Sequence, residues 1–229
     1  MKKFAIYVSL LGAALPVLAG SGPSSSNSPI VSVAISEPRP VAATLLMQAD
    51  FVAVPIYVKS DQKSAAVAYE ESRDNVEMIS QRAKESGKIR VVTGVVYLSH
   101  RESGFGLSTG SWKRPAASAE IFLLVPLDQE HTNIFSGGAE AARFIEGTKL
   151  TGKASCTLGE SQLAVENAEQ YRTKLLELLA QEIKKTRASL AAEGGIRAAG
   201  LESPVMVRQV DDRQVELYLN YSMSIEVDR

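Results

Sequence analysis

The strictest pattern in this chain lies near its C-terminal end, where apolar and polar residues alternate over thirteen positions. Seven apolar side chains occupy every second position from Val215 to Val227, and glutamate, asparagine and serine fill most of the positions between them. A period of two belongs to an extended strand, and one apolar face opposite one polar face is typical of an antiparallel sheet. We therefore expect a long closing strand at 215–227, joined through a hairpin turn at Asp211–Arg213 to a strand at Val205–Val210.

A second period-two pattern lies far upstream. Asp50–Lys59 carries valine or isoleucine at every second position, which predicts a half-buried strand. Pro55 lies in the middle of this segment and has no amide hydrogen to donate to a neighbouring strand. We therefore expect this strand to lie at the edge of its sheet or to contain a bulge.

An amphipathic helix is expected to follow that strand. Ser60 and Asp61 are suitable capping residues, apolar residues then recur at spacings of three, four and seven, and Gly87 is placed to end the helix. Two strands are expected next. Ile89–Leu98 is rich in β-branched residues, and apolar residues alternate from Ala119 to Leu127.

The second half of the chain predicts two further helices. One spans Asp128, as its capping residue, to Ile145, and the Gly137-Gly138 pair weakens its middle by about 1 kcal/mol per glycine. A weaker strand is expected at Leu150–Leu158, followed by the longest helix from Ser161 to about Ala192. The order is therefore β-α-β-β-α-β-α-β-β, which predicts the α+β class, with antiparallel sheets packed against helices.

The N-terminal residues have the three parts of a secretory signal. Lys2 and Lys3 form a positive start, Phe4–Leu18 is mainly apolar, and Ala19 is a small residue at the cleavage position. The apolar run is shorter than the roughly 20 residues that span a bilayer. An uncleaved anchor is the alternative to a cleaved signal. We expect a signal peptide at 1–19, a Ser/Pro-rich linker at 20–40 and one α+β domain at 41–229, in a soluble, periplasmic or otherwise exported protein with no transmembrane segment after cleavage.

The composition argues against several classes of function. The 25 basic and 26 acidic residues leave a formal net charge of −1, whereas a nucleic-acid binder carries a basic excess. One cysteine and two histidines exclude an internal disulfide framework and a multi-thiolate zinc site. We therefore expect no nucleic-acid partner, no metal and no cofactor.

One segment matches a catalytic motif. Gly106–Gly110 reads G-x-S-x-G, the pattern of a hydrolase nucleophile elbow, with Ser108 as the nucleophile and with Asp128 and His131 in triad order. The elbow requires a strand that turns directly into a helix, but here another strand is expected to follow the Gly/Ser-rich stretch. We interpret the segment as a loop, and we expect no catalytic residue.

Two other reactive side chains have structural interpretations. His131 is expected to be a solvated residue in the first turn of the second helix. Cys156 is expected to be a small core residue in a strand, because a nucleophilic thiol needs a nearby base and a lowered pKa. The alternative for Cys156 is an exposed thiol that can be oxidised or can pair between chains.

The loop at Arg101–Pro115 contains the strongest candidate for a binding site. Phe105 and Trp112 lie beside two cations, Lys113 and Arg114, in a glycine-rich segment. Tryptophan and arginine are enriched at the energetic centres of protein interfaces, so this group is a candidate protein contact. The alternative is a loop whose tryptophan folds back onto the core.

Several segments together resemble the SIMPL-domain family of exported bacterial proteins. They are the strand entries at Ala49–Val54 and Ala117–Ile121, Leu150-Thr151-Gly152, the long helix from Glu160, and the terminus VELYLNYSMSIEV. The resemblance covers roughly Val41 to Val227 and implies an SIMPL-like fold, a location in the cell envelope, a non-enzymatic role in protein interaction or envelope stress, and a tendency to self-assemble. It implies no catalytic residues.

These observations leave three hypotheses for the function. The first is a non-enzymatic envelope protein that binds partners or forms oligomers, for which pairing of exposed strand edges is one mechanism. The second is a binding module for a small envelope ligand, which requires a concave apolar pocket. The third is a serine hydrolase that uses Ser108.

Overall fold

The computed structural model describes residues 43–62, 64–98, 117–189 and 196–226, together with the backbone of residues 5–6 and 31–33. The chain divides into two compact units. Unit 1 comprises Met1–Gln48, Val165–Val210 and Gln214–Arg229, and unit 2 comprises Ala49–Ala164 and Asp211–Arg213. Neither unit is one continuous segment. The two segments of unit 2 are inserted at two different places in the sequence of unit 1.

The framework of unit 2 is an antiparallel sheet with β4 (Phe51–Ser60) at its centre. β6 (Ala117–Pro126) pairs with β4 along its full length, and β5 (Arg90–Leu98) pairs with the other side of β6. Two short strands, β7 (Ala154–Leu158) and β8 (Gln162–Glu166), follow one another along the opposite side of β4. The last two residues of β8 belong to unit 1, as does β2 (Val31–Val33), which is next to β8 in the strand order.

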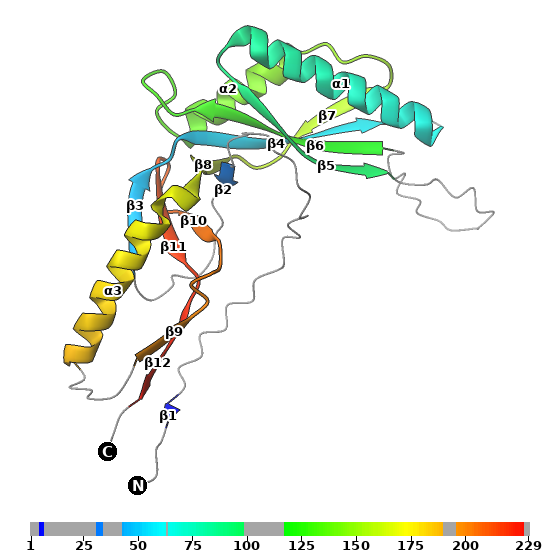
Figure 1. The fold of residues 1–229 in the computed structure, drawn as a ribbon. Helices are drawn as coiled ribbons and strands as arrows, with labels where there is room; N and C mark the ends of the chain where they lie inside the picture. The colour runs from blue at the N-terminus through cyan, green and yellow to red at the C-terminus, as the bar shows by residue number, and fades with distance from the viewer. Residues whose placement is uncertain are drawn as a thin grey trace, which may run out of the picture. The chain divides into compact units, whose positions relative to one another are not determined.

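Two helices, α1 (Ala65–Ser86) and α2 (Ile134–Glu146), cover one face of this sheet (Figure 1). The side chains of β4 under them are those that the period-two pattern selects, and burial of apolar side chains is the main favourable contribution to folding. This part of the sequence prediction is confirmed. The core on this face includes Val52, Val54, Ile56 and Val58 of β4, Ile121 and Leu123 of β6, Ile79 and Ala83 of α1, and Ala141 of α2.

The expectation for Pro55 is wrong, because β4 is a central strand with no bulge in its pairing to β6. β8 pairs with β4 only up to Ala53, and β7 pairs with it only from Ile56. The Pro55 carbonyl accepts a hydrogen bond from the Gly159 amide in the link between β7 and β8. The N–H and C=O of a strand residue point to the same side, so the missing N–H of Pro55 faces this gap between two strands.

Helix α2 runs without a break through Gly137 and Gly138, which were expected to weaken it. Its N-cap is Asn133, whose side chain accepts hydrogen bonds from the amides of Phe135 and Ser136, so Asp128 is not the capping residue. Gly137 is buried against β4, where a β carbon would lie 2.5 Å from a methyl group of Val52. The glycine therefore lets helix and sheet approach closely.

Unit 1 contains a three-stranded antiparallel sheet in the order β10-β11-β3. These strands are β10 (Val205–Gln209), β11 (Gln214–Leu219) and β3 (Thr44–Gln48). The short helix η1 (Ala168–Tyr171) leads into α3 (Arg172–Ser189), which lies along β11 and β3 (Figure 1). The residues buried in this unit include Val205, Val207, Val215, Leu217 and Leu219 of the sheet and Leu175 and Leu179 of α3.

The predicted closing strand is two strands in different sheets. β11 ends at Leu219, and β12 (Ser222–Glu226) lies in a second sheet between β9 (Ile196–Ala199) and β1 (Ala5–Ile6). The alternating pattern of the sequence continues across Asn220 and Tyr221, where the chain leaves one sheet and enters the other. Apolar residues at every second position indicate an extended backbone, but they do not indicate which sheet the strand belongs to.

The predicted long helix is likewise divided. Its first residues form β8, in which Leu163 is fully buried, and helix begins only after Asn167. Asn167 has φ of +51°, a left-handed conformation that separates strand from helix and that asparagine adopts more readily than most residues. The described residues thus form antiparallel sheets with three α-helices, as the α+β prediction states, but contain the additional strands β1, β2, β3, β8 and β9.

Candidate functional site

The site predicted from the sequence lies outside the described residues. This holds for Phe105, Trp112, Lys113 and Arg114, the candidate protein contact. It also holds for Ser108, the nucleophile of the hydrolase hypothesis. These assignments therefore stay predictions.

The two other members of the hypothetical triad lie in the loop before α2. The Asp128 carboxylate accepts hydrogen bonds from the backbone amides of His131 and Glu130 at 2.9 and 2.8 Å, and these bonds hold its pKa below the ordinary value. His131 lies before the helix and is only 6% exposed, so the expectation of a solvated residue in the first helical turn is wrong. Asp128 thus has a local structural role, which is to fold the turn that leads into α2.

Cys156 lies on β7, opposite Val58 of β4, and is half-buried. Burial raises the pKa of its thiol to about 11. The thiol therefore stays protonated at neutral pH, and a protonated thiol is a poor nucleophile. This environment agrees with the interpretation of Cys156 as a structural residue.

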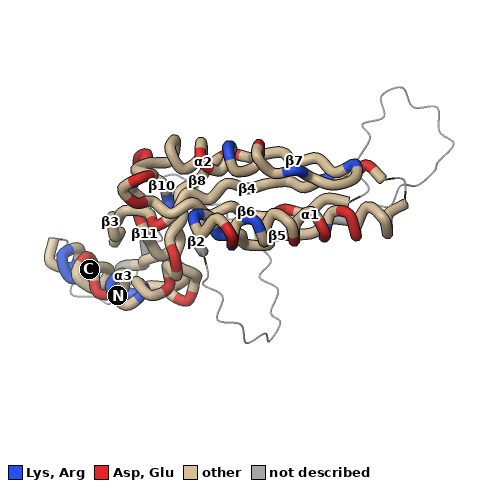
Figure 2. The backbone as a smooth tube through the Cα atoms, turned by 90° about the horizontal axis from the view of Figure 1, so that it is seen from above, with Lys and Arg blue, Asp and Glu red and all other residues tan. Residues whose placement is uncertain are grey.

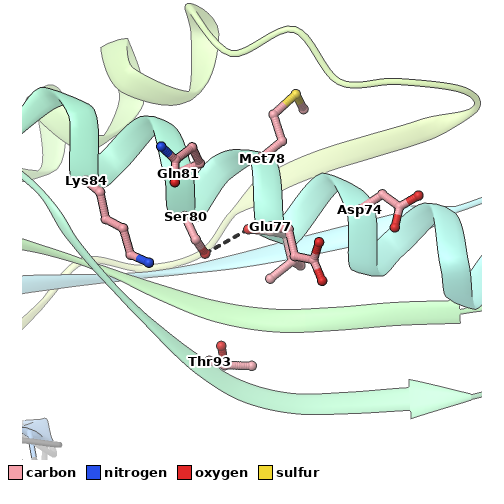
Figure 3. A pocket seen from close by; sticks show the side chains of 8 residues that line it. Asp74, Glu77, Met78, Ser80, Gln81, Lys84 and Thr93 are labelled. Atoms are coloured by element: carbon pink, nitrogen blue, oxygen red, sulfur yellow. Dashed lines mark hydrogen bonds between the residues drawn. The ribbon is translucent and has the colours of Figure 1, made fainter.

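The described residues contain a surface groove of about 620 Å³ between α1 and β5 (Figure 3). Figure 3 shows Glu77, Ser80 and Lys84 on the side of α1 that faces β5, with Thr93 on the strand below them. The Ser80 hydroxyl donates a hydrogen bond to the Val76 carbonyl at 2.8 Å, within the helix. The groove is lined by Asp74, Val76, Glu77, Met78, Ser80, Gln81, Lys84 and Thr93.

The sequence places this polar lining on one flank of α1. Glu77, Gln81 and Lys84 recur at spacings of four and three, which keeps them on one side of a helix. The buried residues Ala68, Ile79 and Ala83 form the side of the helix that packs on the sheet. Because α1 is held down by that apolar side, its polar flank projects beside the outer strand of the sheet.

The strand that borders the groove is the outer strand on its side of the sheet. Within the part of the chain that the structure describes, β5 pairs only with β6. Thr93, Gly94, Val95 and Val96 are all exposed, and the side chains of Val95 and Val96 are among the exposed large apolar groups, at 52% and 44%. An exposed outer strand presents backbone N–H and C=O groups that can pair with another extended chain.

A bulge interrupts the pairing of β5 with β6. Thr93 lies opposite Ile121 and Val96 lies opposite Ala119, so Gly94 and Val95 together face the single residue Glu120. A bulge bends a strand and increases its twist, and natural proteins use such bulges at sheet edges to limit uncontrolled pairing. The bulge thus limits the ways in which another extended chain can pair with the outer side of β5.

Charges of both signs line the groove. Glu77 and Lys84 are two helical turns apart on the same flank of α1. Arg73 lies 2.9 Å from Asp74 and 3.8 Å from Glu77, in exposed ion pairs that contribute little to stability. Figure 2 shows Lys and Arg interspersed with Asp and Glu along the described backbone, without a basic stripe.

The groove runs beside an outer strand whose outward-facing backbone groups can pair with an extended polypeptide. The described residues contain no cluster of three histidine, cysteine, aspartate or glutamate side chains able to hold a metal ion. An added strand obtains affinity from main-chain hydrogen bonds and specificity from pockets beside the strand, and β5 with the flank of α1 offers both. The polar stripe of α1 and the β-branched pattern of β5 are each visible in the sequence, but only the fold brings α1 and β5 together.

No protein-family model and no curated protein matches this chain. Among the described residues, no helix combines the length and the apolar character needed to cross a membrane.

Proposed function

We propose that this chain is a non-enzymatic protein of the bacterial cell envelope, of the SIMPL type, that works through contacts with other protein chains and assembles with copies of itself. A role linked to envelope stress follows from the same resemblance. The signal-like segment before Gly20 supports the location. The observation that carries the contact function is the exposed outer strand β5 beside the groove along α1.

The composition of the groove favours a protein partner over a small ligand. Small-molecule sites are mostly apolar and enclose the ligand. This groove is open to solvent, and three of the eight residues that line it, Asp74, Glu77 and Lys84, are charged. Polar side chains beside an exposed strand are instead compatible with a partner whose own backbone supplies hydrogen bonds.

The self-assembly part of the proposal is tested by the absolute mass of the chain from Gly20 onward. Light scattering during size-exclusion chromatography at micromolar concentrations is expected to give a discrete species heavier than one protomer. A mass of one protomer at every concentration up to about 100 μM would contradict self-assembly.

The export part is tested separately, by expressing the full chain in a bacterial host. Cleavage after Ala19 is expected to yield a periplasmic product that begins at Gly20, which intact-mass spectrometry identifies. A product that keeps its first 19 residues, or one confined to the cytoplasm, would contradict an export signal.

A further inference from the structure

We propose, as an extension of the proposed function on which it rests, that the partner of β5 is β5 of a second copy of this chain. The two strands pair antiparallel about a two-fold axis that passes near Thr93. The sheets of the two unit 2 domains then join edge to edge, and the two α1 helices lie side by side above the junction.

The backbone of β5 supports this pairing. Its outer side has no partner strand among the described residues, and the run from Thr93 to Val96 is exposed. A two-fold axis makes the same surface of both copies meet, so one exposed strand suffices for both partners. The contact also closes on itself, because each copy uses the outer side of its β5 and leaves none for a third chain.

The bulge is compatible with this axis. Val91 faces Leu123 of β6, and Val96 faces Ala119, so both valines lie on the side of the sheet that carries α1. Around an axis at Thr93, the extra residue at Gly94-Val95 brings Val91 of one copy opposite Val96 of the other. The bulge therefore specifies one register, whereas a flat strand would permit several.

The charges along α1 of one copy are complementary to the charges along α1 of the second copy when the two are related by the same axis. In Figure 3, Lys84 and Glu77 lie on opposite sides of Thr93 along the groove. A two-fold axis near Thr93 exchanges these two sides, so Glu77 of each copy faces Lys84 of the other. Such charge pairs at the rim of an interface set register and partner choice more than affinity.

The test uses reversed charges at these two positions in the full mature chain. Glu77→Lys places two lysines opposite each other twice in the dimer, and Lys84→Glu does the same with two glutamates. Each variant alone is expected to weaken association at least tenfold in sedimentation equilibrium. Glu146→Lys and Lys149→Glu make the same charge changes at exposed positions outside the groove and are the matched controls, expected to associate like the wild type.

Mixing the two single variants distinguishes a lost contact from a lost fold. An equimolar mixture of Glu77→Lys and Lys84→Glu chains restores both opposite-charge contacts, so a heterodimer of near wild-type affinity is expected. The double variant Glu77→Lys/Lys84→Glu is expected to form homodimers again. A variant that is merely misfolded would not recover on mixing, so recovery separates a loss of contact from a loss of fold.

A cross-link locates the axis independently. The chain has one cysteine, so Thr93→Cys in a Cys156→Ser background gives a single thiol. Residues directly opposite each other in an antiparallel pair are close enough for a disulfide. Mild oxidation is expected to give a covalent dimer, whereas Val67→Cys in the same background, at an exposed position of α1 outside the groove, is expected to give none.

The outcomes separate the two proposals. If the wild type forms an oligomer, the charge-reversal variants associate equally well and Thr93→Cys gives no cross-link, the β5 interface is wrong and self-assembly still stands. A wild-type chain that is monomeric up to about 100 μM would overturn both self-assembly and the interface. An oligomer that is weakened by either reversal, restored by mixing and cross-linked through position 93 supports both.

Discussion

At the scale of single residues, Gly137 shows how a locally unfavourable choice serves the fold. A glycine in a helix interior is less favourable than alanine by about 1 kcal/mol. Here the missing side chain allows α2 to lie directly on Val52, which is fully buried in the central strand. The gain from close packing in the core exceeds the loss in helix propensity, because interiors are packed to the density of organic crystals.

We predict that Gly137→Ala destabilises unit 2 although alanine is the better helix former. The new β carbon would lie 2.5 Å from Val52, and overpacking of this kind costs about 1–3 kcal/mol. After a propensity gain of about 1 kcal/mol, a net loss of up to about 2 kcal/mol is expected in urea unfolding. Gly138→Ala is the matched control, since its β carbon meets only the Ser161 side chain, whose hydroxyl at 2.7 Å can rotate away. Equal effects of the two substitutions would contradict this explanation.

At the scale of elements, apolar spacing predicts where a strand or helix lies better than it predicts what surrounds it. The β4 pattern identifies the buried valines and isoleucine correctly, because side-chain alternation is a property of the strand itself. The position of Pro55 in a central strand was not predictable, since it depends on the gap between β7 and β8. The division of the closing strand after Leu219 depends in the same way on two separate sheets.

A polar clamp at the start of α3 illustrates a contact that spacing alone does not reveal. The Arg172 guanidinium donates hydrogen bonds to the carbonyls of Leu201 and Ser203 at 2.6 and 2.7 Å, and it pairs with Glu169. Glu169 in turn accepts a hydrogen bond from the Val205 amide at 2.7 Å. The two side chains therefore fasten the loop before β10 to the beginning of α3.

We predict that Arg172→Ala lowers the free energy of unfolding by about 1–2 kcal/mol, since hydrogen bonds to a charged group on a partly exposed side chain are lost. Arg172→Lys is expected to lose most of the same amount, because an ammonium group lacks the planar fork that reaches two carbonyls. The control is Arg143→Ala, which removes an exposed pair with Glu140 and is expected to change stability by less than about 0.5 kcal/mol. Chemical denaturation of the three variants under one condition measures these differences.

At the scale of the whole molecule, the candidate site was only partly accessible from the sequence. The stripe of Glu77, Gln81 and Lys84 and the β-branched segment of β5 are each visible as patterns. The amino-acid sequence does not show that they border one groove, because they are brought together by the packing of α1 on the sheet. The aromatic and basic group of Phe105 and Trp112 lies outside the described residues and stays a prediction.

Three carboxylates with lowered pKa values, Glu71 and Asp128 in unit 2 and Glu169 in unit 1, predict lower stability in acid. Burial raises the pKa of Glu71, but hydrogen bonds from Ser60, Gln62 and the amides of Lys153 and Ala154 outweigh it and hold this pKa below the ordinary value. The pair with Arg172 holds the pKa of Glu169 below its ordinary value, and backbone amides do the same for Asp128.

A carboxyl group whose pKa is lower in the folded than in the unfolded chain stabilises the fold above its unfolded pKa, and this contribution is lost as the pH falls through the folded pKa. The free energy of unfolding is therefore expected to be constant from about pH 7 to 5 and to decrease below the unfolded glutamate value of about 4.5. Urea titrations at pH 7 and pH 3 measure this decrease. Glu71→Gln is expected to be less stable than the wild type at pH 7, and the difference is expected to shrink as the pH falls through the lowered pKa of Glu71, because the wild-type carboxylate is then progressively protonated. Glu146→Gln, at an exposed helix position, controls for the loss of one charge. If Glu71→Gln and the wild type differ by the same amount at both pH values, the contribution of Glu71 comes from its shape and not from its charge, and the expected linkage is wrong.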